Sequence, residues 1–377
     1  SSSCGLRMTT THQEGPPGST GDTVPVVKRE GGMLAKSIRA NGLRTMLLVV
    51  AAVLLAFAVT AVLIAISGKN PSSAYWALIK GAFGSTDRIA FALNRSTPYI
   101  LTGVGIALCF RAKVINIGAE GQIAIGGLAA TAVALYLPQL PLVLIPAAIV
   151  AGAIGGAAWA WVAAVISVKR GVHVVLTTLL LNFVGLLIVG HLLHGILGDP
   201  GAGFPQSPIL PEMAWFPKLL PGTDLHIGIL VAVVAVVAGN FVLWRTTFGF
   251  RLRLMGESHA AADYAGVSTS QCTFAVMLIA GAMAGVAGGI EVLGVHYRLI
   301  EGFSLGFGFS AVAVALLGAT NPVAVLPAGL FLGFLEAGAL SMQREVGVPS
   351  SLVFVIVGMT MVFVLSSIGM STRLRRV

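Results

Sequence analysis

Charged residues are scarce in this sequence. Asp, Glu, Lys and Arg make up 10% of its 377 residues, whereas hydrophobic residues make up 56%. Because a soluble domain carries about 25% charged residues, this composition excludes an ordinary soluble globular protein. The apolar residues fall in long runs, and a helix of about 20 apolar residues can cross the hydrocarbon of a bilayer. The composition therefore predicts an all-α integral membrane protein.

Sequence motifs for catalysis are also missing. Gly68-Lys69 is followed by Asn70 and lacks the upstream glycine of a phosphate-binding loop. The metalloprotease pattern H-E-x-x-H and the hydrolase pattern G-x-S-x-G are absent. The three cysteines have neither metal-site nor redox spacing. We expect a chain that is not an enzyme and binds no cofactor itself, so that ATP and Mg²⁺, if used, act on a partner.

The net charge of +9 is spread along the chain instead of forming one basic patch, which argues against a nucleic-acid partner. Lys and Arg concentrate in the cytoplasmic loops of membrane proteins. With the amino terminus placed in the cytoplasm, most basic residues fall on that side, including those in 245–253. Both termini are therefore expected to be cytoplasmic. The predicted outer loop 68–95, with four basic residues, fits least well.

The chain divides into a tail and one transmembrane domain. Residues 1–40 are rich in Ser, Thr, Gly and Pro without periodicity, which predicts a disordered cytoplasmic tail. Residues 41–377 are expected to form a single domain with about ten spans. We place these spans near 44–67, 96–112, 114–136, 141–167, 173–196, 226–244, 271–295, 305–318, 323–342 and 349–370.

Two spans are interrupted by glycines and polar residues, one beginning near 115–123 and the other near 301–310. Irregular backbone at membrane depth is tolerated where protein or water satisfies it. One interruption falls in each set of four spans, helices 2–5 and 7–10, which run in opposite directions. This pairing predicts an inverted repeat with a transport pathway between its halves.

Polar residues inside the spans are the candidates for that pathway, because such residues are costly in a bilayer. Glu120, beside Asn116 and Gln122, could line the pathway, hold the broken backbone by accepting its free N–H groups, or do both. Asn182 either contacts a polar permeant or bonds to a neighbouring helix. The same alternatives apply to two single carboxylates farther along, Glu291 and Glu336.

Aromatic residues in the second interruption offer another contact. Phe303, Phe307 and Phe309 could stack on a planar ring such as a base, and a packing or lipid-facing role is equally consistent with the pattern. We include Phe307 and Phe309 among the candidate pathway residues.

A polar segment, residues 246–268, separates two apolar spans and has helix-forming composition. It is too polar to cross a bilayer and too short to form a domain. Since the charge pattern places it in the cytoplasm, we expect it to contact a soluble partner.

Several blocks of the sequence resemble bacterial ABC importer permeases of the nucleoside and simple-sugar type, related to ribose and branched-chain amino-acid permeases. The blocks are Asn116-Ile-Gly-Ala-Glu-Gly-Gln122, Gly171-Val-His173, Thr177-Thr-Leu-Leu-Leu-Asn182, Arg245-Thr-Thr-Phe-Gly249, Ala261–Gly266, Gly302-Phe-Ser-Leu-Gly-Phe-Gly308, Ala313-Val-Ala-Leu-Leu-Gly318, Met342-Gln343 and Gly347-Val-Pro349. Val174 departs from this resemblance, because members of the branch often carry an acidic residue there.

The resemblance implies a non-catalytic inner-membrane subunit that moves nucleosides by ATP-driven alternating access. Its implied partners are a homologous or identical second permease, ABC ATPase subunits that bind ATP and Mg²⁺, and an extracytoplasmic substrate-binding protein. The family's ATPase-coupling segment corresponds to Gly256, Glu257, Ala260, Ala261, Tyr264 and Gly266. A bulky charged residue at Gly256 or Ala261 is then expected to abolish uptake in a folded permease.

Other functions remain open at this point. A sibling permease could carry a simple sugar, a riboflavin-like vitamin or an amino acid. An ion-coupled secondary transporter would explain the repeat and the membrane carboxylates, but it would leave the segment 246–268 without a role.

Overall fold

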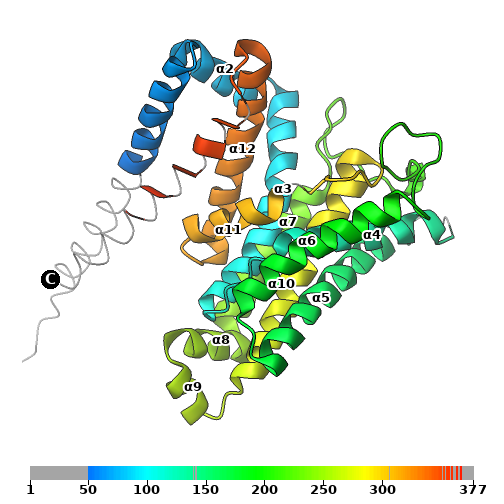
Figure 1. Ribbon diagram of the computed structural model, residues 1–377, viewed down its shortest axis with the longest axis vertical. Helices are drawn as coiled ribbons and strands as arrows, with labels where there is room; N and C mark the ends of the chain where they lie inside the picture. Colours follow the sequence, from blue (N-terminus) through cyan, green and yellow to red (C-terminus); the bar gives the residue numbers. More distant parts are fainter. Residues whose placement is uncertain are drawn as a thin grey trace, which may run out of the picture.

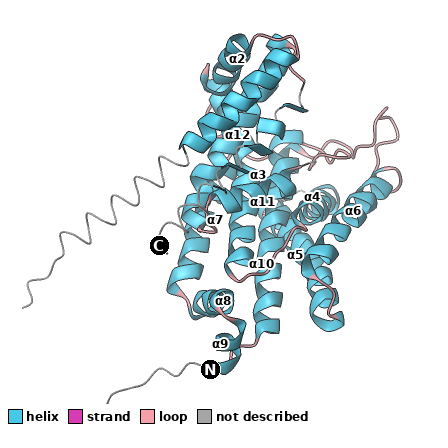
Figure 2. Ribbon diagram, turned by 60° about the vertical axis from the view of Figure 1, so that its left-hand side comes forward, coloured by secondary structure: helices cyan, strands magenta, loops and turns pink. Residues whose placement is uncertain are grey.

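The computed structural model describes residues 50–366 apart from residues 139, 141, 305, 350, 353, 357, 360, 361, 364 and 365. Within that part of the chain, every regular element is a helix (Figure 2). The helices are Val50–Ile66, α2 (Pro71–Phe83), α3 (Thr86–Arg111), α4 (Ala119–Tyr136), α5 (Leu144–Arg170), α6 (Val174–Leu193), α7 (Gly228–Arg245), α8 (Thr247–Glu257), α9 (His259–Tyr264), α10 (Thr269–Glu291), α11 (Phe307–Leu317) and α12 (Pro322–Val346). The all-α fold class is confirmed, and the predicted tail 1–40 lies outside the described residues.

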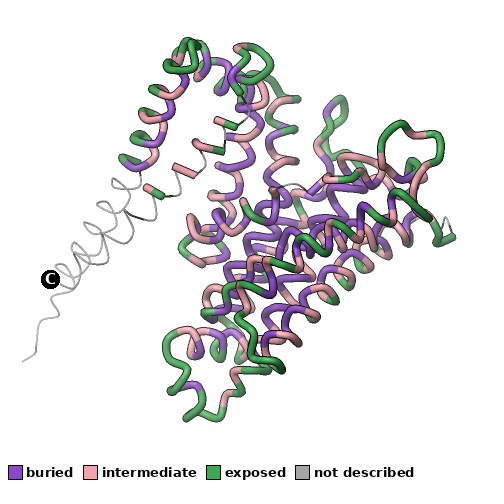
Figure 3. The backbone as a smooth tube through the Cα atoms, viewed as in Figure 1, coloured by how far each residue is buried: buried purple, intermediate pink, exposed green. Residues whose placement is uncertain are grey.

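Among the described residues, five helices are long and apolar enough to cross a membrane, namely α5, α6, α7, α12 and the stretch Thr269–His296 that begins with α10. Val50–Ile66 and α11 are shorter apolar helices. The central helix is α10. In the most apolar part of the stretch Thr269–His296, 72% of the residues are buried, whereas 28% are buried in the corresponding parts of α5 and α7. Figure 3 shows the buried backbone concentrated in the middle of the bundle.

Residues 68–95, predicted as an outer loop between two spans, are mostly helical: they form α2 and the first turns of α3. The side of the membrane on which they lie stays a prediction. The Asn70 side chain accepts a hydrogen bond from the Ser72 amide, and the Ser85 side chain accepts one from Arg88. Such caps satisfy amides that have no partner within the helix. Pro71 also fits the first helical position, where no amide hydrogen is needed.

Glycines bring α5 and α10 into close contact. A Cβ atom at Gly285 of α10 would lie 2.0 Å from the Gly152 carbonyl oxygen of α5, and one at Gly156 would lie 2.2 Å from that of Gly281. Gly152 and Gly156, like Gly281 and Gly285, are four residues apart and share a helix face. This spacing is typical of membrane helices whose backbones touch.

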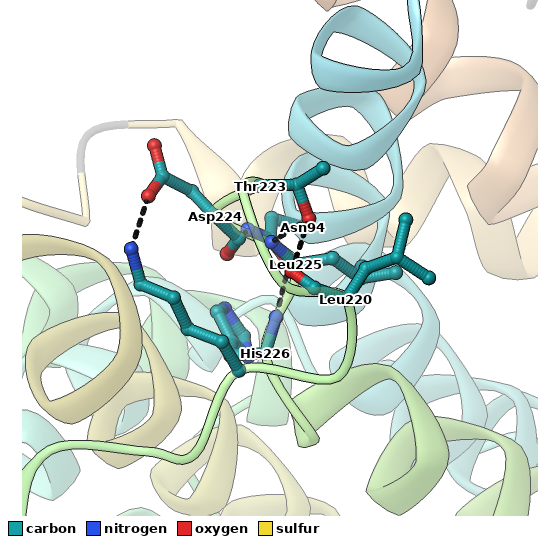
Figure 4. Close-up of polar contacts among 7 residues, drawn as sticks. Asn94, Leu220, Thr223, Asp224, Leu225 and His226 are labelled. Atoms are coloured by element: carbon teal, nitrogen blue, oxygen red, sulfur yellow. Dashed lines mark hydrogen bonds and ion pairs between the residues drawn. The ribbon is translucent and has the colours of Figure 1, made fainter.

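The two ends of the molecule differ. Figure 1 shows α8 and α9 at one end and α2 at the other. At the α2 end, the loop before α7 is attached to α3 through Asn94 (Figure 4), whose side chain donates to the Asp224 carbonyl at 2.6 Å and accepts from the His226 amide at 3.3 Å. His226 is buried, and burial lowers its pKa to about 4. This imidazole is therefore neutral at neutral pH.

Candidate functional site

The two interrupted segments meet at Glu120. This residue lies in the first turn of α4, and its two carboxylate oxygens accept hydrogen bonds from the amides of Gly306 at 3.1 Å and Gly308 at 2.7 Å. Both amides belong to the amino-terminal end of α11, where free N–H groups and the helix dipole favour a negative charge. Glu120 therefore holds the broken backbone, which is one of its two predicted roles. Its other predicted role, lining the pathway, stays a prediction.

Glycine at position 308 is required by this contact. A Cβ atom there would lie 2.2 Å from the Glu120 amide nitrogen, so α11 can approach α4 this closely because position 308 has no side chain. Gly306, with φ of +90°, makes the turn that directs the chain into α11. Two helices thus meet at their amino-terminal ends, as an inverted repeat would place them, and the repeat itself stays a prediction.

The predicted amide side chains support the irregular backbone that precedes α4. Asn182 of α6 accepts from the Gly121 amide at 2.9 Å and donates to the Ile117 carbonyl at 2.8 Å. Asn116 accepts from the Gly118 amide at 2.9 Å and lies 3.3 Å from the Gln122 side chain. The structure therefore brings Asn116, Glu120, Gln122 and Asn182 into one buried cluster.

The two candidate phenylalanines occupy different environments. Phe307 is buried, packs edge-on against Tyr99 at 5.3 Å between ring centroids, and lies 4.8 Å below the Arg95 guanidinium. Phe309 is 42% exposed. Phe307 thus packs within the chain, while contact of either ring with cargo stays a prediction.

Of the two single carboxylates, Glu336 contacts a neighbouring helix as predicted: it accepts hydrogen bonds from Arg95 and Tyr99 of α3. Sequence reasoning missed Arg95 because it placed this residue in a loop, although Arg95 and Tyr99 have the spacing of one helix face. Glu291 instead lies 3.8 Å from His296, across a π-helical turn of its own segment.

The segment 246–268 forms two short helices at one end of the molecule (Figure 1). Thr246 caps α8 by accepting from the Gly249 amide at 3.1 Å, and Ser258 caps α9 by accepting from the Ala261 amide at 3.2 Å. Leu252, Met255 and Ala262 are buried and anchor the pair. Of the six predicted coupling residues, Gly256 is partly buried. The other five are exposed, namely Glu257, Ala260, Ala261, Tyr264 and Gly266.

Gly256 has a structural role that the sequence did not reveal. A Cβ atom there would lie 1.9 Å from the Arg111 carbonyl oxygen at the end of α3. The expectation that a bulky residue at Gly256 leaves the fold intact is therefore wrong, because the opposing atom is backbone. Ala261, whose side chain is exposed, remains a suitable position for testing partner contact.

Residues 88–365 match the family described as branched-chain amino acid transport system / permease component. The chain belongs to this permease family. It is 34% identical to the guanosine ABC transporter permease protein NupP of Bacillus subtilis, covering 84% of this chain and 92% of that protein. It is 35% identical to the glucose ABC transporter permease protein TsgB13 of Haloferax volcanii, covering 84% and 86%.

The nucleoside ABC transporter permease protein NupB of Lactococcus lactis subsp. cremoris is 30% identical, covering 86% of this permease and 92% of its own length. No solved structure matches the chain. Membership of this family, together with the apolar helices, shows a multi-pass membrane permease subunit that is not itself an enzyme. In such transporters ATP acts through partner ATPases.

Proposed function

We propose that this permease moves nucleosides into the cell by ATP-driven alternating access as one subunit of an ABC importer. Two of the relatives described above are named for guanosine or nucleosides, which supports this cargo. The relative named for glucose supports a simple sugar as the second candidate. Ribose and glucose share vicinal hydroxyl groups, so both candidates require polar contacts of the same kind.

The exposed face of α8 and α9 is the observation on which the proposal rests. Tyr264 is 97% exposed, while Ala262 beside it is fully buried, so the segment is anchored on one side and free on the other. ATPase subunits, which bind ATP and Mg²⁺, would dock on Glu257, Ala260, Ala261, Tyr264 and Gly266. ATP binding would then favour one of two permease conformations through its differential affinity for them.

The second permease is proposed to be a different, homologous chain. Second guanosine and nucleoside permeases of the same two organisms, NupQ and NupC, also resemble this chain, but over 64% and 67% of its length, against 84% and 86% for NupP and NupB. Two non-identical permeases would then form the pathway, beside Asn116, Glu120, Gln122, Asn182, Phe307 and Phe309. An extracytoplasmic binding protein would deliver cargo to the α2 end.

This assignment places both termini in the cytoplasm and the protein in the bacterial cytoplasmic membrane. The charge pattern supports the orientation. Arg111 ends α3, and Lys113 just after it donates to the Glu257 carbonyl of α8, so these basic residues lie beside the coupling segment. Lys169 and Arg170 form the basic end of α5.

Reconstitution tests the proposal. The permease is co-expressed with its partner ATPase, second permease and binding protein, and the complex is placed in proteoliposomes. We expect uptake of radiolabelled guanosine that requires both ATP and the binding protein and is not inhibited by excess glucose. Uptake driven by an ion gradient without ATP would contradict the importer, and ATP-driven uptake of glucose or riboflavin in place of guanosine would contradict the cargo.

A further inference from the structure

A cavity of about 280 Å³ lies between α6 and the segment that leads into α11. Leu186, Leu187 and Val189 of α6 face Glu301 and Phe303 across it. An outer loop fixes the second wall: the Glu301 amide donates to the Pro205 carbonyl at 3.1 Å, and the neighbouring Leu299 amide bonds to Ser207. The shape of the cavity is therefore set by backbone contacts outside it.

Glu301 supplies a carboxylate at this cavity. Its side chain is exposed and makes no hydrogen bond or ion pair with the residues that the structure describes. One carboxylate oxygen lies against Gly190 of α6, where an added Cβ atom would come within 2.8 Å of it. The two oxygens are thus free to accept hydrogen bonds from a ligand.

An aromatic ring and a hydroxyl group complete the lining. The Phe303 ring is held between Gly127 of α4 and the His296 ring, whose centroid is 6.5 Å away. Ser304 is fully buried, lies near Glu120, and its hydroxyl has no partner within hydrogen-bond geometry among the described residues. The cavity therefore combines apolar and aromatic walls with a few polar groups, as small-molecule sites do.

We propose that this cavity is a cargo subsite of the permease that recognises an uncharged nucleoside, an inference that rests on the nucleoside import proposed above. The Glu301 carboxylate accepts hydrogen bonds from the two vicinal hydroxyls of the ribose, since an ionised carboxylate is an acceptor with two oxygens. Phe303 and the leucines of α6 contact the base. The same carboxylate repels a phosphate group, so the subsite discriminates against nucleotides.

The test measures cargo preference in the complete transporter. Uptake of a ribonucleoside and of its 2′,3′-dideoxy analogue is compared in proteoliposomes, each cargo being supplied with excess binding protein. Glu301→Gln is expected to lower the ribo/dideoxy uptake ratio about tenfold, the order of effect of a hydrogen bond to a charged group. Gly190→Ala is expected to lower the same ratio, because its methyl group displaces the carboxylate. Glu212→Gln, which alters an exposed carboxylate away from the cavity, should leave the ratio unchanged.

A ratio that stays at the wild-type value in Glu301→Gln and Gly190→Ala, with uptake intact, would overturn the subsite while leaving the proposed function standing. Equal loss of both cargoes would also overturn it, because that result indicates a structural role for Glu301. Gly190→Ala decides the question if Glu301→Gln does not reach the membrane. Failure of the wild-type transporter to move any nucleoside would overturn the proposed function and this subsite together.

Discussion

At the scale of single residues, Glu120 links α4 to α11, whose first amides would otherwise lack hydrogen-bond partners. Its carboxylate satisfies two amides at the start of α11 while remaining part of the first turn of α4. Asn116 and Asn182 do the same for the backbone before α4. These side chains let the backbone be irregular inside the bundle without leaving donors unsatisfied.

Replacing Glu120 with Gln should destabilise the permease. The amide nitrogen of Gln cannot accept a hydrogen bond, so one of the two glycine amides loses its partner, at a cost of about 1–3 kcal/mol. We expect a lower thermal unfolding midpoint for the purified protein in detergent. Glu345→Gln, at a partly exposed ion pair with Arg88, is the control and should change the midpoint little. Equal midpoints for Glu120→Gln and wild type would show that Glu120 does not hold α11.

His226 should make the loop before α7 sensitive to acid. Burial lowers its pKa to about 4 from an ordinary value of 6.5, so the released loop binds a proton more readily than the packed loop. The contribution of His226 to loop stability is therefore present above about pH 6.5 and is lost as the pH falls toward about 4. Hydrogen exchange of residues 218–227, corrected for the intrinsic pH effect, should show reduced protection at pH 5. His226→Gln should remove this pH dependence, and an unchanged dependence in that variant would assign it to another group.

At the scale of helices, α5 and α10 depend on paired glycines. Their backbones touch where Gly152 and Gly156 face Gly281 and Gly285, so α10 can occupy the centre of the bundle. Contact at this distance increases the van der Waals attraction between the helices. Such packing drives helix association inside a membrane, where the hydrophobic effect does not.

Gly285→Ala should disrupt this contact. The new methyl group would overlap the Gly152 carbonyl oxygen, and separating two packed helices costs about 1–3 kcal/mol. We expect a reduced yield of monodisperse permease on size exclusion and a lower thermal midpoint. Gly358→Ala is the matched control, because a Cβ atom there meets none of the residues that the structure describes within 4 Å. Similar behaviour of the two variants would mean that α10 can move away from α5 at little cost.

At the scale of the whole molecule, the proposed contact surface for the ATPases lies at one end of the helix bundle. The exposed face of α8 and α9 lies at one end, while the cluster around Glu120 lies within the bundle. Under the proposed function, movement of α8 would reach the bundle through Gly256, which packs against the end of α3, and through Met255, which is buried.

Ala261→Arg should therefore uncouple the assembled transporter without unfolding the permease. A long charged side chain on the exposed face would block a close contact with the ATPase, so uptake should fall at least about tenfold, equivalent to about 1.4 kcal/mol. Permease abundance in the membrane should be unchanged. Val172→Arg, at an exposed position just after Lys169 and Arg170 at the end of α5, is the control and should transport normally. Normal uptake by Ala261→Arg would show that α9 does not contact the ATPase.

Prediction from the sequence succeeded where local chemistry is sufficient. Long apolar runs indicated the helices, and glycines beside Glu120 indicated a broken span. The helices within residues 68–95 were not predicted, because the charged residues there were assigned to water, although Arg95 pairs with Glu336, a residue 241 positions away. The role of Gly256 and the cavity at Glu301 could not be predicted either, since each depends on a neighbour from another helix.

The amino-acid sequence by itself determined that this protein is a helical membrane protein, and its short motifs indicated the permease family. Composition and hydrophobic length are properties of the chain, and they hold in any arrangement of the helices. The tertiary structure decided which polar groups are satisfied inside the protein and which face a cavity. Asn182, Glu120 and Glu301 are all polar residues near glycines, and what distinguishes them is the distance from each side chain to backbone atoms of a different segment.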